Sequence, residues 1–593
     1  MRDLFLRGCV LLAVATVLIT EVLGAFHWLQ RAPLILAWFV TLAVAALWLR
    51  RRPRLPRLNF RPVETVIGVV IAVIVAIVAV TAAVSPPNSA DAMAYHMPRV
   101  VYWAQAGSVA FFPTPYFNQI SLQPLTEYFY LHTYLLSGGD RYINLVTCAA
   151  FLAAIVGVTS LAGALGLGTR AQAFAALFCA TLPNGILQAS GAKNDWMLAL
   201  WLVCLAYFAA SRNTPFTGLA LALALATKAT AYLFAPPLLL AILLLRRPPS
   251  LARAAAWAAF GILLVNGPQF ARNLRLTGSP LGPDSAHGDG VYRWRNEHPG
   301  LRSTISNGLR HASEQLGGRS PQWNQKVYNS VLAIHHALGM DPQDSDTTWF
   351  DGRYVPPGNA NHEANANNRW HLLFIVAAMV MAAFTRRRVW ILYSSGLIAA
   401  FLLFCFYLKW QQYMVRLELP LFALAAPVAA ALLEALPVGA AALLCLFLLS
   451  GARLPLLDNW TRPLTGPHSL FTSSRDENYF RDMVQWDNRA SYFPAVELTA
   501  ATGCTRVGID ISHNQLEYPF QAMLRERTPA VRFFHTGVEN LTVRYTPLDT
   551  PSPCAVLCLD CAEDSRKVAL YSPVGPPVQI GRFLLFRAIL PAK

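Results

Sequence analysis

Long apolar segments are the feature that most constrains the fold of this chain. Thirteen recur between the N-terminus and residue 453, and a run of roughly 18 or more apolar residues can cross a bilayer as a helix. Only 13% of the residues are charged, against about a quarter in soluble domains. The sequence therefore predicts an all-α polytopic membrane protein. The expected spans are 4–24, 32–49, 64–84, 142–166, 171–187, 195–211, 216–231, 232–246, 253–269, 370–385, 389–408, 418–435 and 437–453.

The formal charge of +16 is concentrated in short loops between these segments. Lys/Arg clusters in short loops mark the cytoplasmic side of a membrane, and these loops lack the interleaved aromatic residues of a nucleic-acid surface. With the N-terminus inside, alternation of the spans places 85–141, 188–194, 270–369 and 454–593 outside. The clusters are Arg50, Arg51, Arg52, Arg54, Arg57 and Arg61; Arg246, Arg247 and Arg253; and Arg386, Arg387 and Arg388.

Three domains follow from this pattern. Residues 1–62 form an N-terminal hairpin with a basic loop, residues 63–453 a membrane domain with long outer segments, and residues 454–593 a small α/β domain. Helical spacing predicts amphipathic helices on the membrane surface over 91–106 and Leu125–Leu136.

The C-terminal domain shows alternating strand and helix signals. RVGID, VRFFH and AVLCLD are predicted strands, with a helix over Gln515–Arg527 and a final hairpin of KVALYS and GRFLLFRAI around Gly575-Pro576-Pro577. CTRVGID and CAVLCLD both run from Cys to Asp. If they are adjacent parallel strands, Cys504 and Cys554 stand side by side and can form a disulfide in an oxidising outer compartment.

Acidic residues are scarce here, so their positions are informative. Asp91, Glu127 and Asp195 all fall at the expected outer ends of membrane helices, where charged groups are costly and indicate a functional site. Each also has a structural explanation, because Asp91 and Asp195 could cap helices and Glu127 could pair with an arginine. Three acids on one side of the membrane favour catalysis.

Basic residues share that side. A lipid phosphate at the interface needs Arg or Lys donors, and the alternative is snorkelling of long side chains to the interface. We expect Lys228 and Arg272 to bind phosphate, with Arg99 and Lys193 as weaker candidates, while the two explanations stay equal for Arg416.

Histidines raise the question of a metal. His362 and His371 are nine residues apart with Glu363 beside the first, which matches no zinc motif, so a structural or acceptor-positioning role is favoured for this segment, and for Tyr95 and His96. Cys558-x-x-Cys561 lacks a second pair, which favours a disulfide or free thiols over zinc.

Several segments resemble one known group of enzymes. They are DAMAYHMPRVVYWAQAGSV, QPLTEYFYLHTYLLSGGDRYINLV, GAKNDWMLALWL, TKATAYL, RNLRLTGSPLGP, HEANANNRWH, RLELPLF and NWTRPL, in order over residues 85–465. The chain resembles the GT-C superfamily of membrane glycosyltransferases, in particular bacterial glycosyltransferase family 39, which includes protein O-mannosyltransferase and aminoarabinose transferase relatives.

The resemblance implies a bacterial inner-membrane enzyme with a periplasmic active site and about 13 membrane helices. Such enzymes move a hexose or pentose from a polyprenyl-phosphate donor to an acceptor hydroxyl with inversion, generally without a divalent metal. Their general base is an acid in the first outer loop, which matches Asp91. This sequence departs from the family at Ala364 and Asn367, and residues 1–62 are an added hairpin.

Two other classes remain as alternatives. A transporter or flippase for a polar lipid or solute also has many spans and buried charges, but commonly shows two related halves; a scaffold protein would not explain the acids. The discriminating observation is whether Asp91, Glu127, Lys228 and Arg272 share one outward site or line a path across the membrane. The sugar and the acceptor, which could be a lipid, glycan, polymer or protein, stay open.

Overall fold

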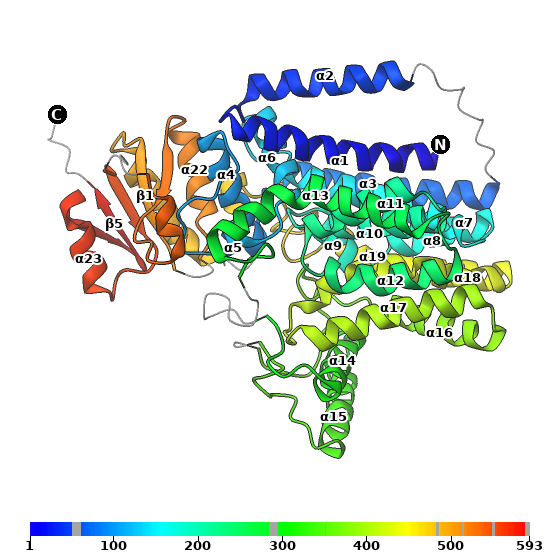
Figure 1. Cartoon of the computed structure of the whole chain (residues 1–593). Coiled ribbons are helices and arrows are strands. Elements are labelled where there is room, and N and C mark those ends of the chain that lie inside the picture. The colour runs from blue at the N-terminus through cyan, green and yellow to red at the C-terminus, as the bar shows by residue number, and fades with distance from the viewer. Residues whose placement is uncertain are drawn as a thin grey trace.

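The computed structural model shows a long bundle of membrane helices with a small α/β domain at one end (Figure 1). The structure describes residues 1–49, 61–283, 294–349, 352–481, 486–512, 515–547 and 552–587. The N-terminus and the C-terminal domain lie at opposite ends of the bundle. We call the end that carries the C-terminal domain the outer end.

The bundle is made of helices that run roughly parallel to its long axis (Figure 1). Glycines let some of these helices approach closely, as is common in membranes: a Cβ at Gly218 would lie 2.5 Å from the backbone of Trp257 on the neighbouring helix. The helices are α1 (Arg2–Ala25), α2 (Arg31–Leu49), α3 (Pro62–Val84), α7 (Ile143–Ala164), α8 (Thr169–Ala180), α9 (Pro183–Ala189), α10 (Asp195–Ala210), α11 (Thr214–Thr227), α12 (Ala231–Leu245), α13 (Leu251–Thr277), α16 (Arg369–Thr385), α17 (Arg388–Tyr407), α18 (Leu419–Ala435) and α19 (Val438–Leu457).

Among the described residues, seven helices are long and apolar enough to cross a membrane, and five shorter apolar helices accompany them. The chain is therefore a multi-pass membrane protein, as predicted. The expected span 171–187 is divided, because α8 ends at Ala180 and α9 begins at Pro183. The residue before a proline is disfavoured in a helix, which explains the break.

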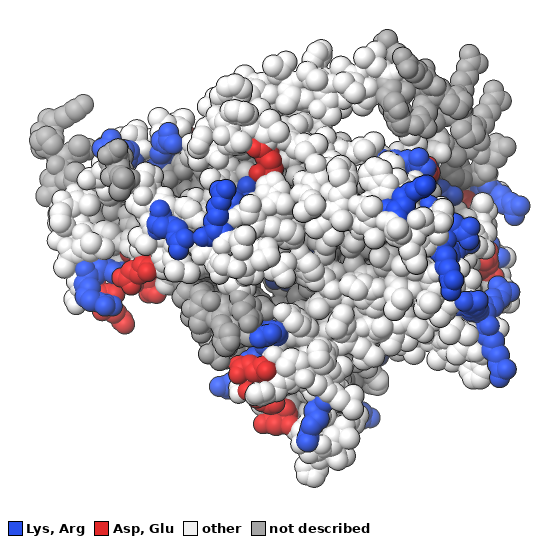
Figure 2. Space-filling model, viewed as in Figure 1, with Lys and Arg blue, Asp and Glu red and all other residues white. Residues whose placement is uncertain are grey.

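Charge follows the predicted arrangement. Figure 2 shows Lys and Arg gathered at the end of the bundle away from the C-terminal domain. Arg246, Arg247 and the Arg386–Arg388 group are exposed there, where α12 ends and where α16 meets α17. Arg61 precedes α3, whereas Arg50, Arg51, Arg52, Arg54 and Arg57 lie outside the described residues.

The first outer segment folds into a π-helix, η1 (Ala92–His96), followed by α4 (Met97–Ala106), α5 (Asn118–Ser121) and α6 (Leu125–Ser137). Pro98 lies in the first turn of α4, and Gly107 ends it at φ 61°, a conformation that glycine adopts without strain. Both predicted helices are present. However, residues 97–103 are buried, so α4 packs inside the protein, against α6 and the C-terminal domain, instead of lying on a membrane surface.

The segment 270–369 contains a protruding helical pair, α14 (Leu301–Leu316) and α15 (Pro321–Ala337), which extends away from the bundle (Figure 1).

The C-terminal domain has a five-stranded sheet of order β2-β1-β3-β5-β4. The strands β1 (Arg506–Asp510), β2 (Arg532–His535) and β3 (Ala555–Cys558) are parallel, while β5 (Phe583–Arg587) is antiparallel to β3 and to β4 (Pro577–Ile580). Its helices include α20 (Arg475–Asn478), α21 (Arg489–Ala500), α22 (Tyr518–Arg527) and α23 (Ser565–Tyr571).

One predicted strand is wrong. KVALYS belongs to α23, and the final hairpin is instead β4 with β5. The Asp564 carboxylate accepts hydrogen bonds from the backbone N–H groups of Arg566 and Lys567, and such an N-cap initiates a helix.

The predicted cysteine pairing is confirmed. β1 and β3 are adjacent and parallel, and Cys504 and Cys554 form a disulfide with their Cα atoms 5.7 Å apart. Cys558 and Cys561 are also disulfide-bonded.

Candidate active site

An ion pair lies where the chain leaves α3 and enters η1. Asp91 directly precedes η1 and pairs with Arg416 of η2 (Met414–Glu418), the short 3₁₀ turn before α18. The phenol of Tyr95 faces the same carboxylate. The side chains of Asp91 and Arg416 keep 23% and 17% of their exposure, so solvent can reach this pair.

A second ion pair lies next to the first. Asp195 opens α10, and Lys228 occupies the extended residue between α11 and α12. The Lys228 ammonium donates to Asp195 Oδ1 at 2.5 Å. Arg416 interacts electrostatically with both Asp195 and Lys228. The four side chains therefore form one charged cluster, in which Asp195 is buried and Lys228 is partly exposed.

The environment keeps Asp91 ionised. Burial opposes ionisation, but the Arg416 guanidinium outweighs it, with help from Lys193 and His96, and holds the pKa of the Asp91 carboxyl well below its usual range.

Glu127 belongs to a neighbouring buried cluster. Its Oε1 accepts from His96 Nδ1 at 2.7 Å and from Arg99 Nη1 at 3.3 Å, and all three side chains are buried. Its Oε2 has no hydrogen-bond partner within the described part of the chain. Glu127 is thus held between two basic groups and closed to solvent, which suits orientation better than direct proton transfer.

Arg272, the other cation predicted to bind phosphate, pairs with a different acid from Lys228. Near the end of α13, its guanidinium donates to Glu21 of α1 through Nη1 at 2.8 Å and Nη2 at 2.7 Å. Tyr128 accepts a third hydrogen bond from it at 2.8 Å. The phosphate role of Arg272 stays a prediction, and in this structure the Glu21 carboxylate already accepts two hydrogen bonds from its guanidinium.

Glu363 anchors a third buried group. It pairs with Lys193 at 2.9 Å and with Arg462, and His362 lies beside it. Arg462 also donates to Asn88 Oδ1 at 2.8 Å and to Ser190 Oγ at 3.1 Å. This network ties together the segments after α3, α9, α15 and α19, and the predicted phosphate role of Lys193 and acceptor role of His362 and Glu363 stay predictions.

Two important residues were not singled out from the sequence. Glu21 is an acid inside the first apolar run, and an ionisable residue in a membrane helix is a usable signal. Arg462 lies within NWTRPL, one of the segments that resemble the GT-C superfamily. By contrast, His371 is buried in α16 with its Nε2 3.1 Å from Thr181 Oγ1, and it joins none of these clusters.

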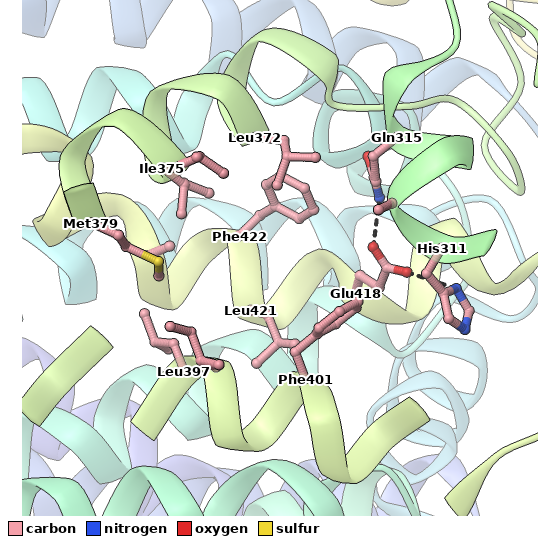
Figure 3. A pocket seen from close by; sticks show the side chains of 14 residues that line it. His311, Gln315, Leu372, Ile375, Met379, Leu397, Phe401, Glu418, Leu421 and Phe422 are labelled. Carbon is pink, nitrogen blue, oxygen red and sulfur yellow. Dashed lines mark hydrogen bonds and ion pairs between the residues drawn. The ribbon is translucent and has the colours of Figure 1, made fainter. Parts of the chain in front are cut away.

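An apolar cavity lies beside Glu418, the last residue of η2. It encloses about 240 Å³ between α14 and the membrane helices α16, α17 and α18, and Figure 3 shows Glu418, Gln315 and His311 together at one end of it. Gln315 donates to Glu418 Oε2 at 2.8 Å. Because Arg416 and Glu418 share the short turn η2, the polar end of the cavity is close in sequence to the Asp91 ion pair.

The one acid–cysteine group that could hold a metal, within the described ranges, is Asp510, Cys558 and Cys561 in the C-terminal domain. Its two cysteines are joined as a disulfide, so they offer no thiolates, which are the form that binds metals. The expectation of metal-independent catalysis stays a prediction.

Comparisons with known proteins show the fold. No protein-family model and no curated protein sequence matches the chain. Among solved structures it is similar to ArnT from Cupriavidus metallidurans bound to undecaprenyl phosphate, at 13% identity and TM-score 0.52, over 88% of this chain and 97% of ArnT. It is also similar to ArnT from the same organism in the apo state, at 15% identity and TM-score 0.50, over 88% and 98% of the two chains. The chain therefore has the GT-C membrane-protein fold that the sequence predicts.

Proposed function

We propose that this protein is a glycosyltransferase that moves a sugar from a polyprenyl-phosphate donor to an acceptor hydroxyl at the outer end of the bundle, with inversion. The observation that carries the proposal is the partly exposed Asp91–Arg416 pair with Lys228 beside it. A carboxylate and two cations in one reachable cluster provide a base for the acceptor and a binding site for the phosphate.

Phosphate binding would proceed by exchange of ion pairs. Arg416 and Lys228 are each neutralised by an acid in the resting structure. A lipid phosphate carries more charge than one carboxylate and accepts several hydrogen bonds, so it competes for both cations. When Arg416 turns to the phosphate, Asp91 loses its main neutralising partner and becomes a stronger base.

The chemical step then balances as a displacement. Asp91 takes the proton of the acceptor hydroxyl while the acceptor oxygen bonds to the anomeric carbon. The bond between that carbon and the phosphate oxygen breaks on the opposite face, and the lipid phosphate leaves with the electron pair. Arg416 and Lys228 stabilise the negative charge that develops on this leaving group.

Two further observations support a lipid donor. The apolar cavity beside η2 lies among membrane helices and suits part of a hydrocarbon chain. In addition, the ArnT structure that shares this fold contains undecaprenyl phosphate.

The geometry favours transfer over transport. Asp91 follows α3, Asp195 begins α10, Lys228 follows α11 and Arg272 is near the end of α13. These charged groups gather at helix ends, as a reaction at an interface requires, whereas a transporter places its site near the bilayer midplane.

The test is loss of transfer in Asp91→Asn. Comparing the envelope glycans and lipids of a deletion strain with those of its parent by mass spectrometry identifies the missing sugar. Purified protein in nanodiscs is then assayed with undecaprenyl-phosphate carrying that sugar. Asp91→Asn keeps the size of the side chain but cannot accept the proton, so turnover should fall by about 10²–10⁴-fold.

The matched control is Glu497→Gln, because Glu497 is an exposed acid that pairs with Arg527 in the C-terminal domain. It should retain full activity. A loss below roughly tenfold in Asp91→Asn would assign Asp91 to a structural ion pair with Arg416 instead. Two results together would overturn the proposed function. They are a deletion strain whose envelope matches that of its parent, and purified wild-type protein that binds a polyprenyl-phosphate donor but transfers no sugar.

A further inference from the structure

The C-terminal domain is attached to the first outer segment by hydrogen bonds of side chains with backbone groups and with other side chains. In Figure 1, α4 lies beside α22 and the sheet. β2 is an edge strand, and the Gln105 amide of α4 pairs with it through Phe533, donating to its carbonyl at 3.0 Å and accepting from its N–H at 2.8 Å. Thr114 and Thr542 exchange two further hydrogen bonds of 2.9 Å. The outer segment therefore completes the open edge of this domain.

Glu517 lies at the centre of this interface. It directly precedes α22 and is fully buried. Its Oε1 accepts from Gln119 Nε2 at 2.6 Å, and its Oε2 accepts from the Tyr102 hydroxyl at 3.0 Å. His535 Nε2 lies 3.0 Å from Oε1. The acid is thus bound from both sides, by its own domain and by the outer segment.

The His535 ring contacts both the outer segment and Glu517. Its Nδ1 faces the Pro113 carbonyl at 3.0 Å and its Nε2 faces the Glu517 carboxylate. Carbonyl and carboxylate oxygens only accept hydrogen bonds, so both contacts are hydrogen bonds when both ring nitrogens carry protons. The ring therefore joins the outer segment at Pro113 to the Glu517 carboxylate.

Gln119 connects this acid to the active-site cluster. Its Nε2 also donates to the Ala94 carbonyl of η1 at 3.0 Å, and its own backbone carbonyl accepts from Arg99 Nε. Gln119 therefore connects Glu517 to two places. Its side chain reaches η1, and its backbone carbonyl reaches Arg99, which pairs with Glu127.

The segment held in this way is unusual. η1 is a π-helix directly after Asp91, and it carries Tyr95 and His96. Short π-helical segments are rare and occur mostly at functional sites. The direction of the Asp91, Tyr95 and His96 side chains depends on this backbone, and the Gln119 amide restrains it at its middle residue.

We propose that Glu517 of the C-terminal domain is a positioning residue for the active site, acting through Gln119 to fix the π-helix that follows Asp91. This rests on the function proposed above only for its effect on turnover. Glu517 does not contact Asp91, and its role is to hold the backbone that carries the reacting groups. The domain is then a required part of the active site and not an appendage.

The experiment uses Glu517→Gln and Gln119→Met in the full-length protein. Glu517→Gln removes the carboxylate at constant size, and Gln119→Met removes the link while leaving the Glu517–His535 pair. The control is Asp140→Asn, because Asp140 also joins the C-terminal domain to the bundle, through Arg475 at 2.7 Å and Tyr518 at 3.0 Å, and these two contacts involve neither α5 nor η1.

Hydrogen exchange and kinetics are measured on all three variants. In Glu517→Gln and Gln119→Met, peptides covering residues 91–99 should exchange faster by about tenfold or more, since a lost charge-assisted hydrogen bond is worth that factor. Peptides of β1 and β3 should be unchanged. Turnover should fall on the order of tenfold to a hundredfold with the donor KM unaltered, whereas Asp140→Asn should keep the wild-type kcat and the wild-type exchange in 91–99.

Each contrary result decides against the proposal. Unchanged exchange in residues 91–99 in both variants shows that Glu517 does not restrain η1. Equal losses in Asp140→Asn assign the effect to docking of the domain in general. If Glu517→Gln unfolds the sheet, Gln119→Met still decides. If wild-type protein transfers no sugar, the proposed function fails while the exchange experiment still tests the positioning.

Discussion

Replacing Arg416 should make kcat/KM depend on the protonation of Asp91 at low pH. In the wild-type protein Arg416 is the main group that lowers the pKa of the Asp91 carboxyl below its ordinary value of 3.8. A base acts in its ionised form, so wild-type kcat/KM should show no acidic limb from Asp91 above about pH 5. In Arg416→Gln, burial remains and the compensating charge is gone, so the pKa of Asp91 rises and activity falls as the pH is lowered.

The size of this effect follows from the charge pair. Two unit charges about 4 Å apart interact by about 4 kcal/mol at the effective dielectric constant of about 20 found near protein surfaces. At 1.36 kcal/mol per pKa unit, loss of the pair should raise the pKa of the Asp91 carboxyl by about two to three units, with Lys193 and His96 limiting the change. This returns the pKa toward its ordinary value of 3.8, so an acidic limb should appear at the low end of the pH range.

The assay is kcat/KM between about pH 3 and 9, with Lys409→Gln as the control. Lys409 lies in the same segment, but its ammonium pairs with Glu297 at 2.8 Å and not with Asp91. Arg416→Gln should also raise the donor KM, because Arg416 is a proposed phosphate ligand. A profile for Arg416→Gln with the same acidic limb as the wild type would refute the assignment of Asp91 as the base.

Two predictions concern the rest of the chain. Replacing Cys504 and Cys554 by Ala should lower the unfolding free energy of the C-terminal domain by about 4 kcal/mol, from the loop-closure entropy of a crosslink spanning 50 residues; denaturant titration checks it, and an unchanged midpoint would contradict it. Reporter fusions at residue 55 and at the C-terminus should report opposite sides of the membrane, and a common side for both would remove the topology and the outer location of the site.

The fold was largely predictable because its signals are local. Apolar runs define the membrane helices, and shorter apolar runs define the strands RVGID and AVLCLD. The pairing of Cys504 with Cys554 was predicted on the condition that these strands are adjacent and parallel, which the structure confirms. KVALYS was mistaken for a strand because a short apolar run fits both periods. The deciding signal was the N-cap Asp564 just before it.

The sequence predicted which charged residues belong to the site, but not which of them form ion pairs with one another. Asp91, Asp195 and Lys228 were singled out because charge at the end of an apolar run is costly. That Asp91 pairs with Arg416, 325 residues later, depends on which helices pack together, and no local pattern contains that information. For the same reason Glu21 could be noticed as an acid in α1, but its partner Arg272 could not be inferred.

The pairings rank the cations as phosphate ligands. Arg416, Lys228, Arg272 and Lys193 each contact an acid in the resting structure, so a phosphate competes with a carboxylate at each of them. Displacing Glu21 from Arg272 breaks two hydrogen bonds to the same acid and frees no base near η1. Displacing Asp91 from Arg416 frees a partly exposed carboxylate beside the bound phosphate. In the proposed function, donor binding at Arg416 would therefore prepare the base in the same step. This coupling makes Arg416 a better candidate for the phosphate than Arg272, which the sequence favoured together with Lys228.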